Sequence, residues 1–98
     1  MLLAFSVAPA TSQAEDGSVS EAVAAAVAIV RQSGLPHETT SMFTTIEGEW
    51  DEVMAVVKEA TDAVLAVSPR ASLVMKADIR PGYSGQLTAK VERINERL

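Results

Sequence analysis

The residues of this sequence that could bind or transform a small molecule fall into two short segments. Thr44 and Glu47 lie in a threonine-rich stretch, and Asp78 and Arg80 stand two positions apart just before a Pro-Gly pair. A carboxylate beside hydroxyl groups can hold a cation or accept hydrogen bonds. A carboxylate near a guanidinium either forms a surface ion pair of small energetic consequence or lines a polar pocket. These segments are the first candidates for a functional site.

Catalytic and metal sites find less support. His37 is the only histidine and there is no cysteine, so thiolate chemistry is excluded and a Ser-His-Asp triad would depend on His37 alone. The acidic run at positions 47–52 offers oxygen ligands for a metal, but carboxylates opening a helix are the commoner explanation. The glycines are scattered and form no phosphate loop. We therefore expect a non-enzyme without catalytic residues, metal or cofactor. Were the chain an enzyme, its base would be Glu47 or Asp78.

Length and charge limit the function classes further. A chain of 98 residues supports one core, so residues 1–98 are expected to form a single domain. The formal net charge of -5 argues against nucleic acid and anionic membranes as partners. Hydrophobic residues make up 48% of the chain but aromatic residues only 4%, so the core is built from small groups and association with further copies would supplement it.

The apolar opening segment, residues 1–8, could be mistaken for a signal peptide. No Lys or Arg precedes its apolar run, and the run is short for that purpose. No stretch of the sequence approaches the roughly 18 apolar residues of a membrane span. We interpret the segment as a strand and expect a cytoplasmic protein.

Hydrophobic periodicity predicts the elements of the first half. Leu3, Phe5 and Val7 alternate with smaller residues over about 2–9, which is typical of a strand. Ser18 and Glu21 have the spacing of a capping box at the start of a helix, and that helix is expected to end near position 34, at a glycine. The Thr-rich segment 37–47 lacks helical period and predicts two short strands joined by a tight turn near positions 40–41.

The second half repeats the order of helix and strand. Acidic residues predict a helix start at about Glu49, and apolar spacing places Trp50 and Val53 on the buried face of that helix. Residues 70–80 alternate between a fully apolar and a mostly polar face, and residues 87–98 predict a last amphipathic helix. The order predicts an α+β fold: a four-stranded antiparallel sheet with two helices on one face, and a further helix at the C-terminal end.

One block of the sequence resembles a known family. The pattern Thr44-x-Ile46-Glu47-Gly48-x-Trp50-Asp51 is similar to that of the small thiamine-binding-protein family, whose members are about this long. The resemblance covers nearly the whole chain. It includes the segments Phe5-Ser6-Val7 with Pro9, Ser18-Val19-Ser20-Glu21, Ser33-Gly34-Leu35, and Asp78-Ile79-Arg80 with Gly82.

The resemblance implies a ferredoxin-like βαββαβ sandwich and dimers that pair into tetramers. It also implies a ligand of the thiamine or hydroxymethylpyrimidine type, bound without chemistry. Thiamine carries a cationic thiazolium and an aminopyrimidine edge, so its site needs a carboxylate, hydroxyls and an apolar wall. The candidate ligand-binding residues are Ser20, Met42, Thr44, Glu47, Trp50, Asp78 and Arg80.

Three positions leave alternatives open. Arg80 would repel a cation unless Asp78 or a phosphate pairs with it. At position 43, where many relatives carry glycine, this chain has Phe43, whose ring either fills part of the pocket or joins an oligomer interface. Trp50 either belongs to the core or an interface, or stacks on the ligand. The alternative function is an oligomeric regulatory or interaction module that binds another metabolite or none, since fold alone does not decide function.

Overall fold

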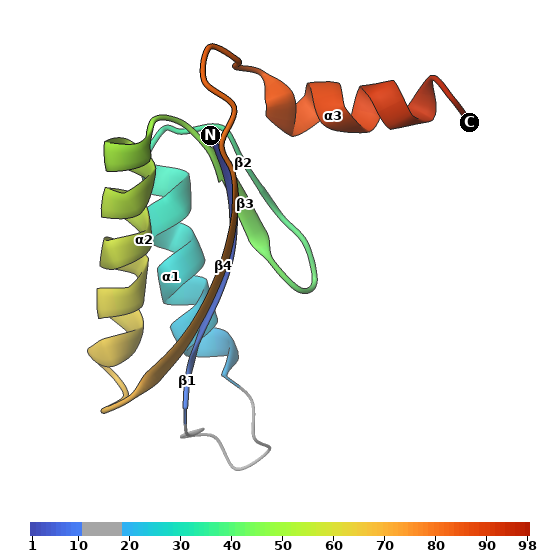
Figure 1. Cartoon of the computed structure of the whole chain (residues 1–98). Helices are drawn as coiled ribbons and strands as arrows, with labels where there is room; N and C mark the ends of the chain where they lie inside the picture. Colours follow the sequence, from blue (N-terminus) through green and yellow to red (C-terminus); the bar gives the residue numbers. More distant parts are fainter. Residues whose placement is uncertain (11–18) are drawn as a thin grey trace.

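The computed structural model describes residues 1–10 and 19–98 and shows a sheet covered by helices on one side (Figure 1). The elements follow the predicted order. They are β1 (Leu2–Pro9), α1 (Ser20–Gln32), β2 (His37–Thr39), β3 (Thr44–Glu47), α2 (Trp50–Leu65), β4 (Ala71–Asp78) and α3 (Gln86–Asn95). The interpretation of the opening segment as a strand is confirmed, as are the two short strands between positions 37 and 47.

The four strands form one antiparallel sheet in the order β2-β3-β1-β4, which confirms the predicted α+β, ferredoxin-like fold. In the central strand, Leu3 lies opposite Ile46 on β3 and Ala77 on β4, and these side chains point toward the helices. The alternate positions point to the open face. Leu2 lies opposite Glu47 on one side and Asp78 on the other, so both carboxylates are on that open face.

The core lies between the sheet and the helix pair α1 and α2. Its buried apolar members come from β1, α1, β3 and α2: Leu3, Phe5, Val7, Ala22, Ala26, Val30, Ile46, Val53, Val57, Ala60 and Val64. Apart from Phe5 these are aliphatic groups, as the low aromatic content predicted. The helical stripes bury Ala and Val at spacings of three and four residues, which keeps one face of each helix toward the sheet.

Two predictions about helix starts need correction. The capping box at Ser18 falls partly outside the described residues, and α1 begins later than predicted, at Ser20, with Val19 at the N-cap and no capping side chain. Trp50 does not belong to the buried stripe of α2: its side chain, at the first residue of the helix, is 55% exposed. The predicted end of α1 is confirmed, since Gly34 follows it with φ +77°.

The start of α2 explains the glycine in the Glu47-Gly48-Glu49 segment. Glu49 is the N-cap, and the Glu52 side chain accepts a hydrogen bond from the Glu49 backbone N–H at 2.8 Å, which completes a capping box. A Cβ atom at Gly48 would lie 2.8 Å from the Glu52 Oε1 atom and 3.1 Å from a Val53 methyl group. The acidic residues therefore serve the helix start, and only glycine leaves room for them.

The C-terminal helix α3 stands apart from this layered body. It extends away from the sheet on the side opposite α1 and α2 (Figure 1), and none of its residues is buried. Val91 and Ile94 on its predicted apolar face are 53% and 59% exposed. The apolar face of β4 is also less covered than its alternation predicted, since Leu73 is 37% and Met75 45% exposed beside α2. Within the described part of the chain, no helix has the length and apolar character needed to cross a membrane.

Candidate functional site

Glu47 connects the sheet to the C-terminal helix. Its side chain is only 7% exposed, and its two carboxylate oxygens accept hydrogen bonds from the backbone N–H groups of Gln86 at 2.9 Å and Leu87 at 3.2 Å. These amides open α3, where helix N–H groups have no partner within the helix and the helix dipole favours negative charge. Gly85, at the N-cap with φ +66°, supplies no capping side chain of its own. A residue 39 positions away therefore acts as the cap of α3.

One cavity beside Glu47 is acidic, and we call it the acidic cavity. It has a volume of about 390 Å³ and lies between the N-terminal ends of α2 and α3. Its lining residues are Leu35, Pro36, Glu47, Gly48, Glu49, Glu52, Ser84, Gly85, Leu87 and Thr88. Among these described residues there are three carboxylates and no Lys or Arg. An apolar wall and two hydroxyl groups complete a lining that suits an organic cation.

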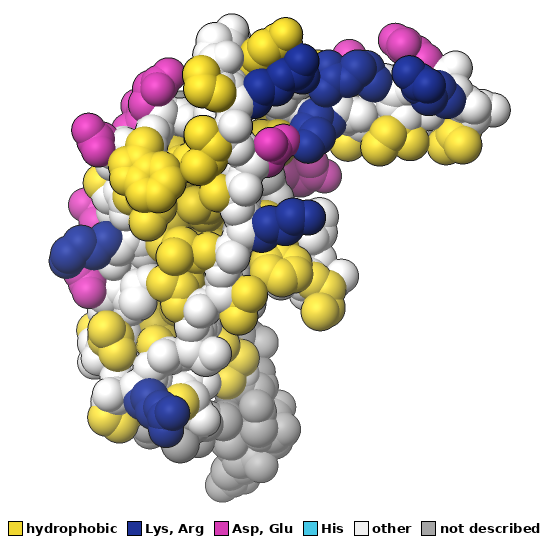
Figure 2. Space-filling model, in the orientation of Figure 1, with side chains coloured by type: hydrophobic (Ala, Val, Ile, Leu, Met, Phe, Trp, Pro, Cys, Tyr) yellow, Lys and Arg dark blue, Asp and Glu magenta, His cyan; other side chains and the backbone are white. Residues whose placement is uncertain are grey.

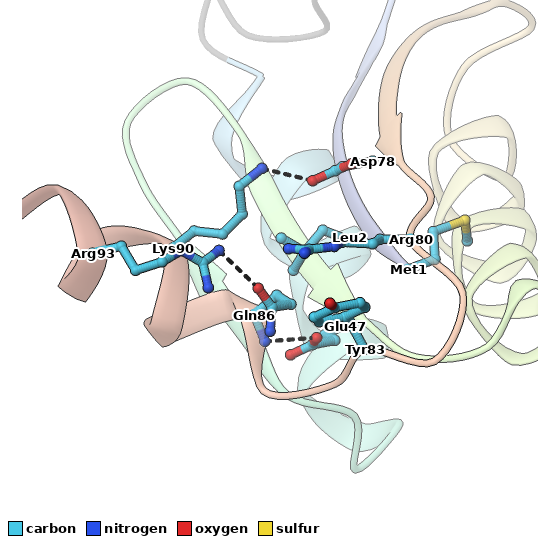
Figure 3. Close-up of a pocket in the computed structure, with 9 residues that line it drawn as sticks. All are labelled: Met1, Leu2, Glu47, Asp78, Arg80, Tyr83, Gln86, Lys90 and Arg93. Carbon is cyan, nitrogen blue, oxygen red and sulfur yellow. Dashed lines mark hydrogen bonds and ion pairs between the residues drawn. The ribbon is translucent and has the colours of Figure 1, made fainter.

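A second cavity lies on the other side of Glu47, and we call it the basic cavity (Figure 3). Its volume is about 250 Å³, and it is lined by Met1, Leu2, Glu47, Asp78, Arg80, Tyr83, Gln86, Lys90 and Arg93. Because Glu47 belongs to both linings, the two cavities lie next to one another at this residue. One side of the α3 N-terminus therefore presents negative charge and the other a majority of positive side chains.

The charges of the basic cavity are partly paired. Lys90 on α3 donates a hydrogen bond to the Asp78 carboxylate at 2.6 Å, and this ion pair lowers the pKa of Asp78 below its ordinary value of 3.8. Arg80 does not pair with Asp78; its guanidinium carbon lies 3.5 Å from the centre of the Tyr83 ring, in a cation–π contact. An ion pair between Asp78 and Arg80 was one of the two possibilities that the sequence allowed. In the structure the Asp78 carboxylate pairs with Lys90 instead.

Arg93 is the third basic group of this cavity. Its guanidinium donates a hydrogen bond of 2.9 Å to the side-chain oxygen of Gln86, a neutral acceptor. Figure 3 shows Arg93 and Arg80 reaching toward the same space from opposite sides, one from α3 and the other from the segment after β4. Within residues 1–10 and 19–98, neither guanidinium forms an ion pair with a carboxylate.

The structure brings together three of the seven candidate ligand-binding residues. Glu47, Asp78 and Arg80 line the basic cavity. Glu47 ends β3 and Asp78 ends β4 at the same end of the sheet, on either side of Leu2 in β1, and Arg80 follows β4. Thr44 is buried on the helix-covered face, with its hydroxyl 3.3 Å from that of Thr39. An odd spacing separates Thr44 from Glu47, so the two side chains point to opposite faces of the strand.

The remaining three candidates lie away from both cavities. Ser20 opens α1 at the end of the sheet opposite to Glu47 (Figure 1), and Met42 is 73% exposed in the turn between β2 and β3. Trp50 lines neither cavity. Phe43 lines neither one, because it lies in the turn before β3, whereas Glu47 is the last residue of β3.

Sequence reasoning missed several lining residues. Tyr83, Lys90 and Arg93 in the basic cavity and Ser84 and Thr88 in the acidic cavity belong to α3 and the segment before it. Their spacing marked an amphipathic helix with a charged outer side. Nothing local in the sequence shows that the first amides of this helix bind the Glu47 carboxylate. The residues in contact are 39 and 40 positions apart in the sequence.

The described residues offer little for catalysis or metal binding. No group of three or more His, Asp or Glu side chains among them could hold a metal ion. His37 Nδ1 donates a hydrogen bond to the Leu35 carbonyl oxygen at 2.8 Å, which fixes the ring at the start of β2. Glu49 and Glu52 hold the first turn of α2, as described above. His37, Glu49 and Glu52 therefore each form a hydrogen bond that stabilises the start of a strand or helix.

Comparison with known proteins identifies a matching family. The profile of a family described as thiamine-binding protein matches residues 3–95, nearly the whole chain. The chain belongs to the thiamine-binding protein family. Among its relatives, a UPF0045 protein of Mycobacterium bovis is 48% identical over 99 residues, which cover 100% of this chain and 94% of the relative. A UPF0045 protein of Synechocystis is 36% identical over 82 residues, 83% of this chain and 68% of that protein.

Solved structures of the family have the same fold. A hypothetical protein of Methanocaldococcus jannaschii superimposes with a TM-score of 0.85 and 30% identity, over 97% of this chain and 95% of its own. A Thermotoga maritima protein assigned provisionally to thiamine biosynthesis or salvage superimposes with a TM-score of 0.76 and 27% identity, over 94% of this chain and 97% of its own. The names of these relatives include no catalytic activity of a defined kind.

Proposed function

We propose that this protein is a non-catalytic, cytoplasmic binding protein for thiamine or a related hydroxymethylpyrimidine, acting as a homo-oligomer. The observation that carries the proposal is the acidic cavity in a chain of this family. Thiamine needs a carboxylate for its thiazolium, hydroxyls for its polar edge and an apolar wall for its ring faces. The cavity supplies Glu52 and Glu49, Ser84 and Thr88, and the side chain of Leu87.

The balance of charge favours a cation over a neutral ligand. Glu47 is compensated by the α3 amides, whereas the Glu49 and Glu52 carboxylates accept one backbone hydrogen bond each within the capping box. Both keep lone pairs and negative charge for a ligand. At a partly exposed site an opposite charge within about 4 Å contributes up to about 4 kcal/mol at an effective dielectric constant of 20. A thiazolium ring beside these carboxylates is therefore stabilised.

The exposed apolar surface supports the oligomeric part of the proposal. Val91 and Ile94 form an uncovered face on α3, and Leu73 and Met75 remain half-exposed on β4. Figure 2 shows hydrophobic side chains along the side of α3 that faces back toward the body of the molecule, and a further group over α2 and β4. A helix of about 10 residues is marginal without tertiary packing. A second copy would bury α3 and cover the apolar strand, and pairing of such dimers gives the expected tetramer.

Isothermal titration with thiamine, and with hydroxymethylpyrimidine in parallel, tests the ligand. The informative variant is Glu52→Gln, because glutamine can still accept the capping hydrogen bond while the negative charge is removed. We expect saturable micromolar binding to the wild type. Glu52→Gln should weaken the affinity for thiamine at least tenfold, which corresponds to about 1.4 kcal/mol. It should affect hydroxymethylpyrimidine less, because that ligand has no thiazolium.

The matched control is Glu59→Gln, which removes an exposed charge from the same helix outside either cavity lining. This variant should bind thiamine like the wild type. Absence of heat with both ligands at millimolar concentration, from folded and oligomeric protein, would contradict the proposal. The alternative, an oligomeric regulatory or interaction module, would then be the better description.

A further inference from the structure

The basic cavity contains positively charged side chains that no carboxylate of the described residues neutralises. Of its three basic side chains, only Lys90 has a carboxylate partner. Glu47, the other carboxylate in the lining, is buried and occupied by the amides of α3. Arg80 and Arg93 therefore leave two guanidinium charges without an ion pair in the part of the chain that the structure describes.

Their present partners do not compensate these charges. Arg80 lies over the Tyr83 ring and Arg93 donates to the neutral Gln86 side chain, so each is oriented but neither is neutralised. The Tyr83 ring covers one face of the Arg80 guanidinium, whereas the N–H groups of a guanidinium lie around its edge and stay available for a bidentate acceptor. Two oriented guanidinium groups at one cavity match the oxygens of a phosphate group better than those of any neutral ligand.

The position of this charge next to the acidic cavity adds a second requirement. The cavities adjoin at Glu47, with carboxylates on one side and guanidinium groups on the other. Unphosphorylated thiamine would bind only in the acidic cavity, because its positive charge would be repelled by the basic cavity. A ligand that carries a cationic ring and a phosphate ester would place opposite charges in both cavities at once.

We propose that the basic cavity binds the phosphate group of a phosphorylated ligand through Arg80 and Arg93, so that the preferred ligand is the phosphate ester of a thiamine-like cation. This inference rests on the proposed function for the cationic part of the ligand, while the phosphate site itself follows from the two guanidinium groups. It also accounts for Arg80, which has no role in binding free thiamine.

Titration of the wild-type protein with thiamine, thiamine monophosphate and inorganic pyrophosphate tests the inference. Thiamine monophosphate should bind at least tenfold more tightly than thiamine, and this advantage should shrink as the salt concentration rises. Arg80→Gln and Arg93→Gln should each remove most of the advantage of thiamine monophosphate over thiamine. Both side chains are exposed, so the variants are expected to fold. The control Arg31→Gln changes an exposed arginine of α1 outside either cavity and should keep the full advantage.

The outcomes separate the two proposals. Equal affinity for thiamine and its monophosphate would overturn the phosphate site and leave the proposed function standing. An advantage that survives in both arginine variants would overturn it as well. If the protein binds pyrophosphate through Arg80 but does not bind thiamine, the phosphate site is supported and the thiamine proposal is overturned. No binding of any of the three compounds would overturn both.

Discussion

Replacing Glu47 by Ala should release α3 from the body of the protein. The substitution removes the two hydrogen bonds from the Gln86 and Leu87 amides, at 2.9 and 3.2 Å, to a buried carboxylate. Hydrogen bonds to charged groups contribute about 1.5–3 kcal/mol each, but the freed amides of a helix start can be solvated, so the net loss should be about 2 kcal/mol. Because α3 has no buried residue, this loss should appear as local opening and not as global unfolding.

Amide hydrogen exchange measured by NMR distinguishes local from global effects. A loss of about 2 kcal/mol should speed exchange in α3 roughly thirtyfold, since 1.4 kcal/mol is a factor of ten. The amides of β1 should keep their protection. Glu47→Gln, which retains one good acceptor, should fall between the wild type and Glu47→Ala. The control Glu38→Ala removes an exposed glutamate from β2 and should leave α3 unchanged. Unchanged exchange of α3 in Glu47→Ala would refute the reasoning.

Three further predictions follow from particular contacts. Gly48→Ala should displace Glu52 from its capping position and lower the free energy of unfolding by about 1 kcal/mol in urea titrations; an unchanged midpoint would contradict the close contact of 2.8 Å. The pKa of Asp78 is lowered in the folded state, so the stability from its ion pair with Lys90 is present above the ordinary value of 3.8 and is lost as the pH falls through the lower folded value. NMR titration should place the Asp78 midpoint below 3.8, and Lys90→Met should raise that midpoint toward 3.8; an identical midpoint in both proteins would show that the ion pair does not form in solution. Val91→Asp should convert the oligomer to monomers in sedimentation experiments while the circular dichroism spectrum stays folded; persistence of the oligomer would show that α3 is outside the interface.

Periodicity was sufficient to predict the layered part of the fold. Leu3, Phe5 and Val7 alternate as a strand must, and the Val and Ala spacings of α1 and α2 mark one buried face each. These signals are local and repeat along the element. The error at Trp50 has the same origin: helical spacing places it on the stripe, but its side chain at the first residue of α2 is 55% exposed, and only the tertiary structure shows which part of a stripe is covered.

The candidate site was less predictable because it depends on contacts far apart in the sequence. The resemblance included Glu47, Asp78 and Arg80 among its candidates, and these do line one cavity at one end of the sheet. Thr44 and Glu47 looked like neighbours in one short motif, yet the strand turns them to opposite faces. The basic residues of α3 looked like a solvated face, and they line a cavity only because Glu47 fixes where this helix begins.

Glu47 accepts two hydrogen bonds from the first amides of α3 and also lines both cavities. A carboxylate that caps a helix cannot be removed without also moving the helix, so loss of ligand in Glu47→Ala would not show that Glu47 touches the ligand. The same logic links ligand and assembly: α3 carries part of both cavity linings and the exposed apolar face at Val91 and Ile94. If α3 forms the proposed interface, a ligand bound at the start of α3 would stabilise the position of the helix in which its apolar face contacts a second copy. Ligand binding and oligomer formation should therefore favour one another, by the same factor in each direction.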